Sequence, residues 1–252
     1  MPDVGFAPIL TALAEELALF ALDNLAVDLI YFARRLWRGA TVYTRFPRAF
    51  AQTMAGADLG GWMAVFIPAW DEGAVIAPML RKTLTRFGCG DYRLSVGHYP
   101  NDPATAQAIA SACDLHIVPV IVPHPGPTTK ADCFNQLYDA RQLEEAARGP
   151  APAIVLHDAE DVVYPCELMQ FARLIDRAAA IQLPVVPLPD PTSPWIAGHY
   201  CDEFAESHGK ELVVREAVGA AITLAGSPAR LNAARSRGLP NGIMAAPSPP
   251  TA

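Results

Sequence analysis

The stretch WMAVFIPAWDE, residues 62–72, decides the fold class: an apolar run is followed at once by two acids. A run that is apolar at every position predicts a strand buried on both faces, as in a parallel sheet. The same pattern returns in AIVLHDAED, residues 153–161, where a second apolar run ends in acidic side chains. The sequence therefore predicts two buried strands that each carry polar groups at the carboxyl end.

Strands and helices alternate on both sides of these two runs. Further strands are predicted at 92–99, 115–122 and 181–187. Helices are predicted at 73–87, 103–112, 130–148, 165–179 and 199–216. This alternation predicts an α/β fold, a mostly parallel sheet with flanking helices joined by right-handed crossovers. The prolines of the strand at 181–187 indicate an edge position or an early end.

Length and composition set the class of protein and the size of its domains. The chain has 252 residues and a formal net charge of −7. Binding the phosphate backbone of nucleic acid needs a basic surface, so no nucleic-acid partner is expected. We expect one sizeable domain over residues 60–216. The five cysteines include no CxxC pair, which favours reduced thiols over a disulfide framework or a zinc knuckle.

Residues 1–40 are expected to form an apolar helix that precedes the sheet. The run 17–33 is strongly apolar, and a run of this kind followed by basic residues is typical of a membrane segment with a cytoplasmic basic end. Two charged sets accompany it, the arginines Arg34, Arg35 and Arg38 and the acids Glu15, Glu16, Asp23 and Asp28. Spanning the membrane, lying along its surface and packing as a core helix stay open. We favour membrane association, which predicts a bacterial inner-membrane location with the main domain facing the cytoplasm, and a cytoplasmic location otherwise.

The last segment, residues 217–252, differs from the rest of the chain. It contains no acid and no aromatic residue, and it ends in APSPPTA. No apolar period continues after Leu231. We expect an atypical, weakly ordered tail.

Charged side chains collect where the predicted strands end. In parallel α/β sheets, ligands bind beyond the carboxyl ends of the strands. The candidate binding residues are Asp71 and Glu72 after the first strand, Asn101 and Asp102 after the second, Lys130 and Asp132 after the third, and Asp158 and Glu160 after the fourth. The chain has no GxGxxG, GxxxxGK[ST] or GxSxG motif, which excludes the usual sites of Rossmann dehydrogenases, P-loop NTPases and α/β-hydrolases.

Asp158 and Glu160 are the candidate metal ligands. Crowded carboxylates hold their charge more easily beside a cation, and Mg²⁺ or Mn²⁺ takes carboxylate oxygens and often shares a ligand's phosphates. The alternative is a solvated turn that caps the helix predicted near Pro165. Asp102 has a similar alternative, because it precedes Pro103 and caps a helix there. Lys130 begins a helix, where a cation is unfavourable against the helix dipole. A bound anion nearby would explain its placement, and the alternative is a solvated surface lysine.

Several motifs in a fixed order resemble family 2 glycosyltransferases of the GT-A, Rossmann-like fold. They are VFIPAWDEGAVI (65–76), GHYPNDPAT (97–105), PGPTTKADCFN (125–135), VLHDAEDVVYP (155–165), IQLPV (181–185) and GHYCDEFAESHGKELVVREA (198–217). Within that family they are most similar to the bacterial inner-membrane enzymes called phage adsorption protein B, whose membrane segment resembles LDNLAVDLIYFARRLWR (22–38).

The resemblance implies transfer of a sugar from a nucleotide-sugar, a UDP-sugar by expectation, to a glycan or other acceptor. It implies that Asp71 and Glu72 line the nucleotide pocket, that Asp102 meets the base and that Lys130 meets the diphosphate. It also implies that Asp158 and Glu160 occupy the DxD position, where Mg²⁺ or Mn²⁺ is held. In the family, the position of Asp71 is usually Asn and that of Glu160 usually Asp.

The resemblance ends before the segment in which the family carries its acceptor site and catalytic base. We therefore expect a C-terminally truncated chain and assign no catalytic residue. Two other functions stay open. One is a non-catalytic component of a surface-polysaccharide or phage-receptor assembly, with inner-membrane and envelope partners. The other is a metal-dependent hydrolase that uses the acids of residues 157–161.

Overall fold

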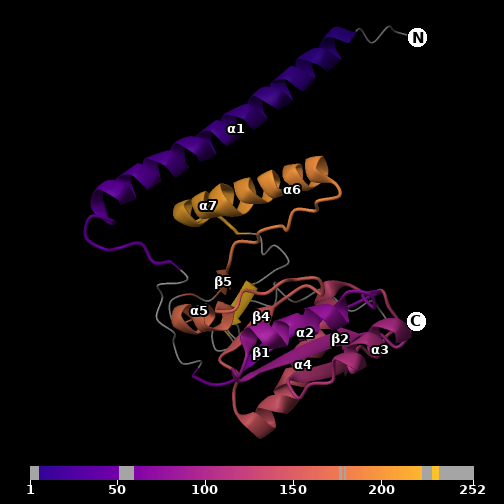
Figure 1. The fold of residues 1–252 in the computed structure, drawn as a ribbon. Coiled ribbons are helices and arrows are strands. Elements are labelled where there is room, and N and C mark those ends of the chain that lie inside the picture. Colours follow the sequence, from indigo (N-terminus) through magenta and orange to yellow (C-terminus); the bar gives the residue numbers. More distant parts are fainter. Residues whose placement is uncertain (1–5, 51–59, 176–177, 179, 223–228, 233–252) are drawn as a thin grey trace. The chain divides into compact units, whose positions relative to one another are not determined.

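The computed structural model describes residues 6–50, 60–175, 178, 180–222 and 229–232, with the side chains of residues 7 and 229–232 left out (Figure 1). The chain divides into two compact units. One comprises residues 50–183 with 224–252 and holds the sheet, and the other comprises residues 1–49 with 184–223 and is helical. Each unit is described by itself.

The sheet has the strand order β3-β2-β1-β4-β6-β5 in the described part of the chain. The bounds are β1 Met63–Pro68, β2 Tyr92–His98, β3 Ile117–Ile121, β4 Ala153–Leu156, β5 Ala180–Gln182 and β6 Ala229–Asn232. The first four strands pair in parallel, with Val65 of β1 beside Leu94 of β2 and Val155 of β4. The prediction of a mostly parallel sheet with flanking helices is confirmed.

Helices cover both faces of this sheet because the apolar side chains of its strands alternate between two cores (Figure 1). The bounds are α2 Ile76–Phe87, α3 Pro103–Ala112, α4 Lys130–Arg148 and α5 Glu167–Leu174. Met63, Val65 and Ile67 pack with apolar residues of α2, α3 and α5 on one face. Ala64 and Phe66 pack with apolar residues of α4 on the other. Strands this fully buried on both sides account for the continuous apolar runs in the sequence.

The strand order places a topological switch point between β1 and β4. From β1 the chain moves outward through β2 to β3, and it then returns to lay β4 on the other side of β1. A crevice forms at such a point, outside the carboxyl ends of the strands, because the two neighbouring connections diverge to opposite faces of the sheet. The segments that follow β1 and β4 are therefore the ones to inspect for a site.

The far edge of the sheet differs from the sequence-based expectation. The fifth strand is short, Ala180–Gln182, and pairs antiparallel with β6, which itself pairs antiparallel with β4. Pro184 and Pro187 follow β5 and cannot donate a ladder hydrogen bond, which fits the early end expected there. The strand β6 lies in the segment 217–252, where no strand was predicted. Most of that segment, and the end of the helix predicted to reach residue 179, fall outside the described residues, so the weakly ordered tail stays a prediction.

The helical unit contains α1 Phe6–Thr41, α6 Pro194–Glu206, a π-helical turn η1 Ser207–Glu211 and α7 Leu212–Val218. Helix α1 contacts η1 and α7. Lys210 of η1 pairs with Asp28 of α1 at 2.5 Å and with Glu206 of α6, and Arg34 pairs with Glu216 at 3.3 Å. Ion pairs between α1 and the η1–α7 segment thus join parts of the chain about 180 residues apart.

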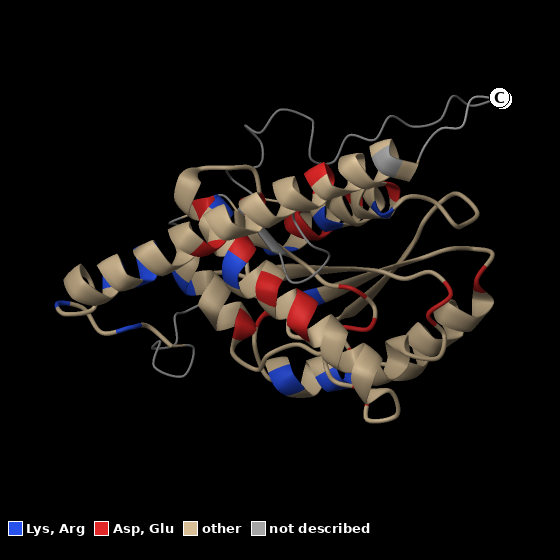
Figure 2. Cartoon of the chain, turned by 90° about the horizontal axis from the view of Figure 1, so that it is seen from above, with Lys and Arg blue, Asp and Glu red and all other residues tan. Residues whose placement is uncertain are grey.

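The prediction of a bacterial inner-membrane location is contradicted. Helix α1 has 36 residues, about 54 Å at the usual rise, so its length is sufficient. Acidic residues interrupt the apolar sequence of α1, and arginines follow near its C-terminal end. Figure 2 colours the acidic residues of the chain red and its lysines and arginines blue. Among the described residues, no helix combines the length and the apolar composition needed to cross a bilayer.

Candidate functional site

The loop that follows β1 is tied to the start of α3. The backbone N–H of Asp71 donates to Oδ2 of Asp102 at 2.7 Å, and the N–H of Glu72 donates to Oγ1 of Thr105 at 2.9 Å. Asp71 has a φ of +58°, a left-handed conformation that Asp and Asn adopt more easily than most side chains. These hydrogen bonds fix the backbone of Asp71 and Glu72 next to the carboxyl end of β2.

Asp102 serves the backbone with both carboxylate oxygens. Its Oδ1 accepts the N–H of Thr105 at 3.1 Å, so the residue caps α3, as Pro103 at the first helical position led us to expect. Burial by itself would raise the pKa of Asp102, but hydrogen bonds from Thr105 and from the N–H of Asp71 outweigh it, and the pKa lies below its ordinary value. The carboxylate of Asp102 is buried and holds the loop after β1 in place. Its contact with a nucleotide base stays a prediction.

Glu72 lies where carboxylates from three strands converge. Burial raises its pKa, and the negative charges of Glu160, Asp71, Asp158 and Asp102 raise it further. Glu160 makes the largest of these charge contributions, although it follows β4 and not β1. The segments after β1 and β4 therefore face one another across the switch point, as the parallel strand order requires.

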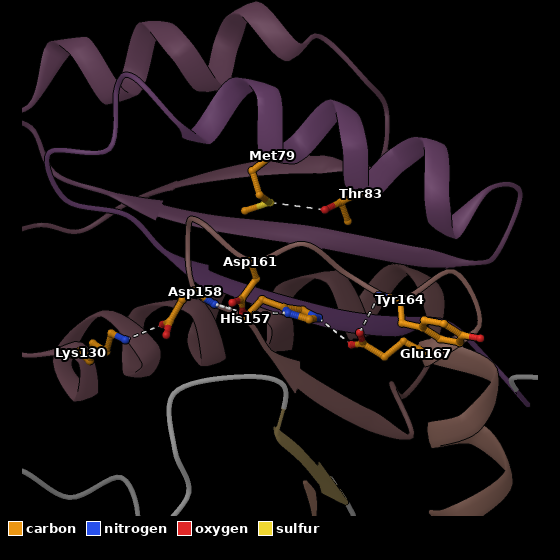
Figure 3. A network of polar contacts seen from close by, with 8 residues as sticks. All are labelled: Met79, Thr83, Lys130, His157, Asp158, Asp161, Tyr164 and Glu167. Carbon is orange, nitrogen blue, oxygen red and sulfur yellow. Dashed lines mark hydrogen bonds and ion pairs between the residues drawn. The ribbon is translucent and has the colours of Figure 1, made fainter. Parts of the chain in front are cut away.

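Lys130 brings a positive charge to these acids through an ion pair with Asp158. Its Nζ lies 2.5 Å from Oδ1 of Asp158, across from α4 to the segment after β4 (Figure 3). Thr129 caps α4 by accepting the N–H of Asp132 at 3.2 Å, which sets Lys130 at the first position of the helix. A lysine there opposes the helix dipole, and Asp158 supplies the compensating negative charge.

Asp158 sits in a turn that is closed on itself. The N–H of Asp158 donates to Oδ2 of Asp161 at 2.8 Å, and the N–H of Asp161 donates back to the carbonyl of Asp158 at 3.2 Å. Oδ2 of Asp161 also lies 3.3 Å from Nδ1 of His157, whose Nε2 lies 2.7 Å from Oε1 of Glu167 (Figure 3). In this turn Asp158 is half-buried and Glu160 is exposed.

His157 is the buried centre of this arrangement. Burial would lower its pKa, but the carboxylates of Glu167 and Asp161 raise it to about 9. The imidazole is therefore positively charged at neutral pH and donates from both ring nitrogens. The sequence analysis did not single out His157 or Glu167 as site residues. A histidine at a strand end and a glutamate at a helix start ten residues later form no recognised sequence motif. Their pairing depends on how the chain folds between them.

A second loop contact lies beside the acids. Nδ2 of Asn101 donates to the carbonyl of Gly126 at 2.8 Å and Oδ1 accepts its N–H at 2.7 Å, so both polar atoms of this side chain are engaged. A Cβ on Gly126 would lie 2.4 Å from two ring carbons of Trp70 and 2.8 Å from Cγ of Tyr99. Only glycine allows this approach. Asn101 thus fixes the loop after β3, and a direct role in ligand binding stays a prediction.

Asp132 stands apart from the converging acids. It lies near Tyr99 and Cys133, where burial raises both pKa values and the charge of Asp132 raises them further. Its Oδ2 is buried without a hydrogen-bond partner. The structure therefore brings six of the eight candidates into one group, and the other two, Asn101 and Asp132, lie outside it. The six are Asp71, Glu72, Asp102, Asp158, Glu160 and Lys130.

The group offers two oxygen ligands, Asp158 and Glu160, from one turn. Among the described residues, no three His, Cys, Asp or Glu side chains are arranged to hold a metal ion by themselves. Mg²⁺ is commonly bound through one or two carboxylates together with water and substrate phosphates. The residues present fit such a site, in which an anionic ligand completes the coordination.

Comparisons with known proteins agree with this architecture. The family described as "Glycosyltransferase like family 2" matches residues 60–234. Bacteriophage adsorption protein B of Escherichia coli (strain K12) is 37% identical over 225 residues, which cover 88% of this chain and 30% of that protein. Bacteriophage N4 adsorption protein B of Escherichia coli O157:H7 gives the same values. The chain thus spans less than a third of the length of these relatives.

A solved structure is also similar. The mannosyltransferase PcManGT from Pyrobaculum calidifontis, in complex with GDP-Man and Mn²⁺, matches with a TM-score of 0.47 and 16% sequence identity. The match covers 84% of this chain and 56% of that one.

Proposed function

The chain belongs to the glycosyltransferase-like family 2, and from that premise we propose that it binds a UDP-sugar and transfers the sugar to a glycan or other acceptor. The observation that carries the proposal is that the segments after β1 and β4 flank the switch point of the sheet, where the charges of Asp158 and Glu160 raise the pKa of Glu72 beyond what burial does. This is the place where an open α/β sheet accommodates a nucleotide.

Charge supports a cation-assisted donor site. The diphosphate of a UDP-sugar is an anion, and acids outnumber Lys130 at this edge. Repulsion would exclude the donor unless a cation neutralised both. We propose that Asp158 and Glu160 hold Mg²⁺ or Mn²⁺ together with the diphosphate. That ion would offset the negative charge that develops on the departing diphosphate.

The chain's own residues have separate tasks in this proposal. Lys130 would move from its ion pair with Asp158 to the diphosphate, where its charge would offset the negative charge that develops on UDP as the bond to the sugar breaks. Asp102 and Thr105 keep Asp71 and Glu72 in place through backbone hydrogen bonds. No residue of the chain is proposed as the base that deprotonates the acceptor.

Calorimetry with UDP tests the donor site. Wild-type protein is expected to bind UDP at least tenfold more tightly with Mn²⁺ than with EDTA, and uridine is expected to show little dependence on Mn²⁺. Asp158→Asn and Lys130→Met should each weaken the Mn²⁺-dependent binding by tenfold or more. Absence of any Mn²⁺-dependent binding by the wild type contradicts the proposal.

A matched control comes from a second ion pair. Asp91 pairs with Arg148 as Asp158 pairs with Lys130. Asp91 directly precedes β2, so it lies at the amino ends of the parallel strands and not at their carboxyl ends. Asp91→Asn should bind UDP like the wild type. If it weakens binding as much as Asp158→Asn does, the effect comes from loss of charge in general and not from the site.

Turnover assays separate the three functions that the sequence left open. Release of UDP from a UDP-sugar that requires an added acceptor glycan supports transfer. Release at the same rate without an acceptor supports a hydrolase. Mn²⁺-dependent UDP binding without release under either condition supports a non-catalytic donor-binding role.

A further inference from the structure

A chain of buried polar contacts runs from the start of α5 to the candidate metal ligand. Glu167, at the first position of α5, contacts His157 at 2.7 Å. His157 contacts Asp161 at 3.3 Å, and Asp161 accepts the backbone N–H of Asp158 at 2.8 Å. Glu167 also accepts the N–H of Tyr164 at 3.4 Å, so it ties both ends of residues 157–164 (Figure 3).

Burial makes these contacts costly to break. The side chain of His157 is 3% exposed and that of Glu167 is 2% exposed, whereas the side chain of Asp161 is 22% exposed. A buried polar group that loses its partner pays the desolvation cost without compensation, so the ring of His157 is confined between its two carboxylates. The ring in turn confines Asp161, and Asp161 confines the peptide that carries Asp158.

The acidic sequence HDAED therefore divides its acids between two tasks. Glu160 is exposed, and the side chains of Asp158 and Asp161 are about equally buried, at 25% and 22% exposed. The two aspartates differ in what they contact: Oδ1 of Asp158 pairs with Lys130, whereas Oδ2 of Asp161 accepts the N–H of Asp158 and contacts His157. These hydrogen bonds fix the backbone from which Asp158 and Glu160 extend. Such preorganisation lowers the cost of ordering ligand groups on binding.

We propose that Asp161, His157 and Glu167 are positioning residues that hold Asp158 and Glu160 for a divalent cation and a nucleoside diphosphate. The inference rests on the proposed function and deepens it. These three residues do not touch the ligand in this proposal, and they act through the closed turn. Their contribution is to the affinity for the metal-bound diphosphate and not to the stability of the fold alone.

Asp161→Ala is the main test, because this side chain is the most exposed of the three and its loss should leave the fold intact. Its UDP affinity in Mn²⁺ should fall at least tenfold, while binding in EDTA should stay within about twofold of the wild type. Asp161→Asn keeps an oxygen that accepts the N–H of Asp158, so it should restore Mn²⁺-dependent affinity to within about threefold. Glu167→Gln, which keeps an acceptor for His157, should behave like Asp161→Asn.

Phe171→Leu is the control for a purely structural role. Phe171 is buried in the apolar core one turn further along α5. The substitution should lower the melting temperature and leave the Mn²⁺-dependent UDP affinity unchanged. Wild-type affinity in Asp161→Ala, or a loss in Phe171→Leu equal to that in Asp161→Ala, overturns the proposal. An Asp161→Asn variant as weak as Asp161→Ala also overturns it, because the charge of Asp161 would then matter and not its hydrogen bond.

Amide hydrogen exchange keeps this inference separate from the proposed function. The N–H of Asp158 should exchange slowly in the ligand-free wild type and at least tenfold faster in Asp161→Ala. Slow exchange with no Mn²⁺-dependent binding by the wild type would remove the donor site but leave the closed turn. Equal exchange in wild type and Asp161→Ala removes the closed turn, whatever the protein binds.

Discussion

Replacement of Asp102 by alanine removes hydrogen bonds from two backbone N–H groups through one side chain. The lost helix cap, the bond from the N–H of Thr105, costs about 1 kcal/mol. The N–H of Asp71 loses its carboxylate acceptor in a partly buried loop, which costs about 2 kcal/mol. Together they predict a fall of about 3 kcal/mol in the free energy of unfolding. For a chain of this size that corresponds to a melting temperature about 6–12 °C lower.

Urea unfolding followed by far-ultraviolet circular dichroism measures this change. Asp102→Asn keeps one acceptor oxygen but presents an amide where the other oxygen was, so it should lose about half as much stability as Asp102→Ala. Asp114 is the matched control, because it accepts the N–H of His116 at 2.8 Å from an exposed position. Asp114→Ala should change the free energy of unfolding by no more than about 0.5 kcal/mol.

The pH dependence of the same variants has a definite sign. The pKa of Asp102 is lower in the folded protein than its ordinary value of 3.8. Its contribution to stability is therefore fully present above pH 3.8 and is lost as the pH falls through the lower, folded pKa. The difference between wild type and Asp102→Asn should shrink in that acidic range. A loss below about 1 kcal/mol in Asp102→Ala at neutral pH would refute the assignment of two bonds to this carboxylate.

Three further predictions follow from burial and packing. Burial raises the pKa of Cys133 to about 12, so iodoacetamide at pH 8 should label the exposed Cys89 and leave Cys133 unmodified, as read by mass spectrometry of the folded protein. Gly126→Ala places a methyl group 2.4 Å from ring carbons of Trp70, so it should lower stability by about 1–3 kcal/mol and alter tryptophan fluorescence; an unchanged spectrum and melting temperature would contradict the contact. His157 has a pKa raised to about 9, so its contribution to stability is full below pH 6.5 and should decline as the pH rises to 9, a slope that His157→Gln should lack.

The sequence predicted the helices and strands that local signals specify. Asp102 with Pro103 marked the start of α3, and the helix beginning at Lys130 has the expected bounds. Both depend on a cap and on the first turn, which neighbouring residues determine. The continuous apolar runs likewise predicted β1 and β4, because a strand buried on both faces needs apolar residues at every position.

The parts that sequence reasoning missed depend on partners far along the chain. The strand β6 is held by hydrogen bonds to β4, about 75 residues earlier, and its own sequence ARLN has no strand pattern. The inner-membrane prediction gave too much weight to the apolar residues of α1 and too little to its acids. The pairing of Lys210 with Asp28 shows how one of those acids is used inside the helical unit.

The site shows the same division between local and distant causes. That polar residues follow each strand could be predicted from the sequence, and the parallel order explains why Glu72 and Glu160 approach one another. What each acid does could not be predicted. Asp102 is a candidate binding residue in the sequence, and Asp161 belongs to the same acidic turn as Asp158, yet both accept backbone N–H groups in the structure.

That occupation explains how so many carboxylates share one edge. The negative charges of Asp102 and Asp161 are compensated by hydrogen bonds that each carboxylate accepts from backbone N–H groups. These two carboxylates therefore bind a cation less readily than Asp158 and Glu160 do. Lys130 compensates the charge of Asp158. If an anionic donor draws Lys130 to its diphosphate, Asp158 loses that part of its compensating charge. Binding of the donor and binding of a divalent cation should therefore favour one another, since each supplies the charge that the other requires.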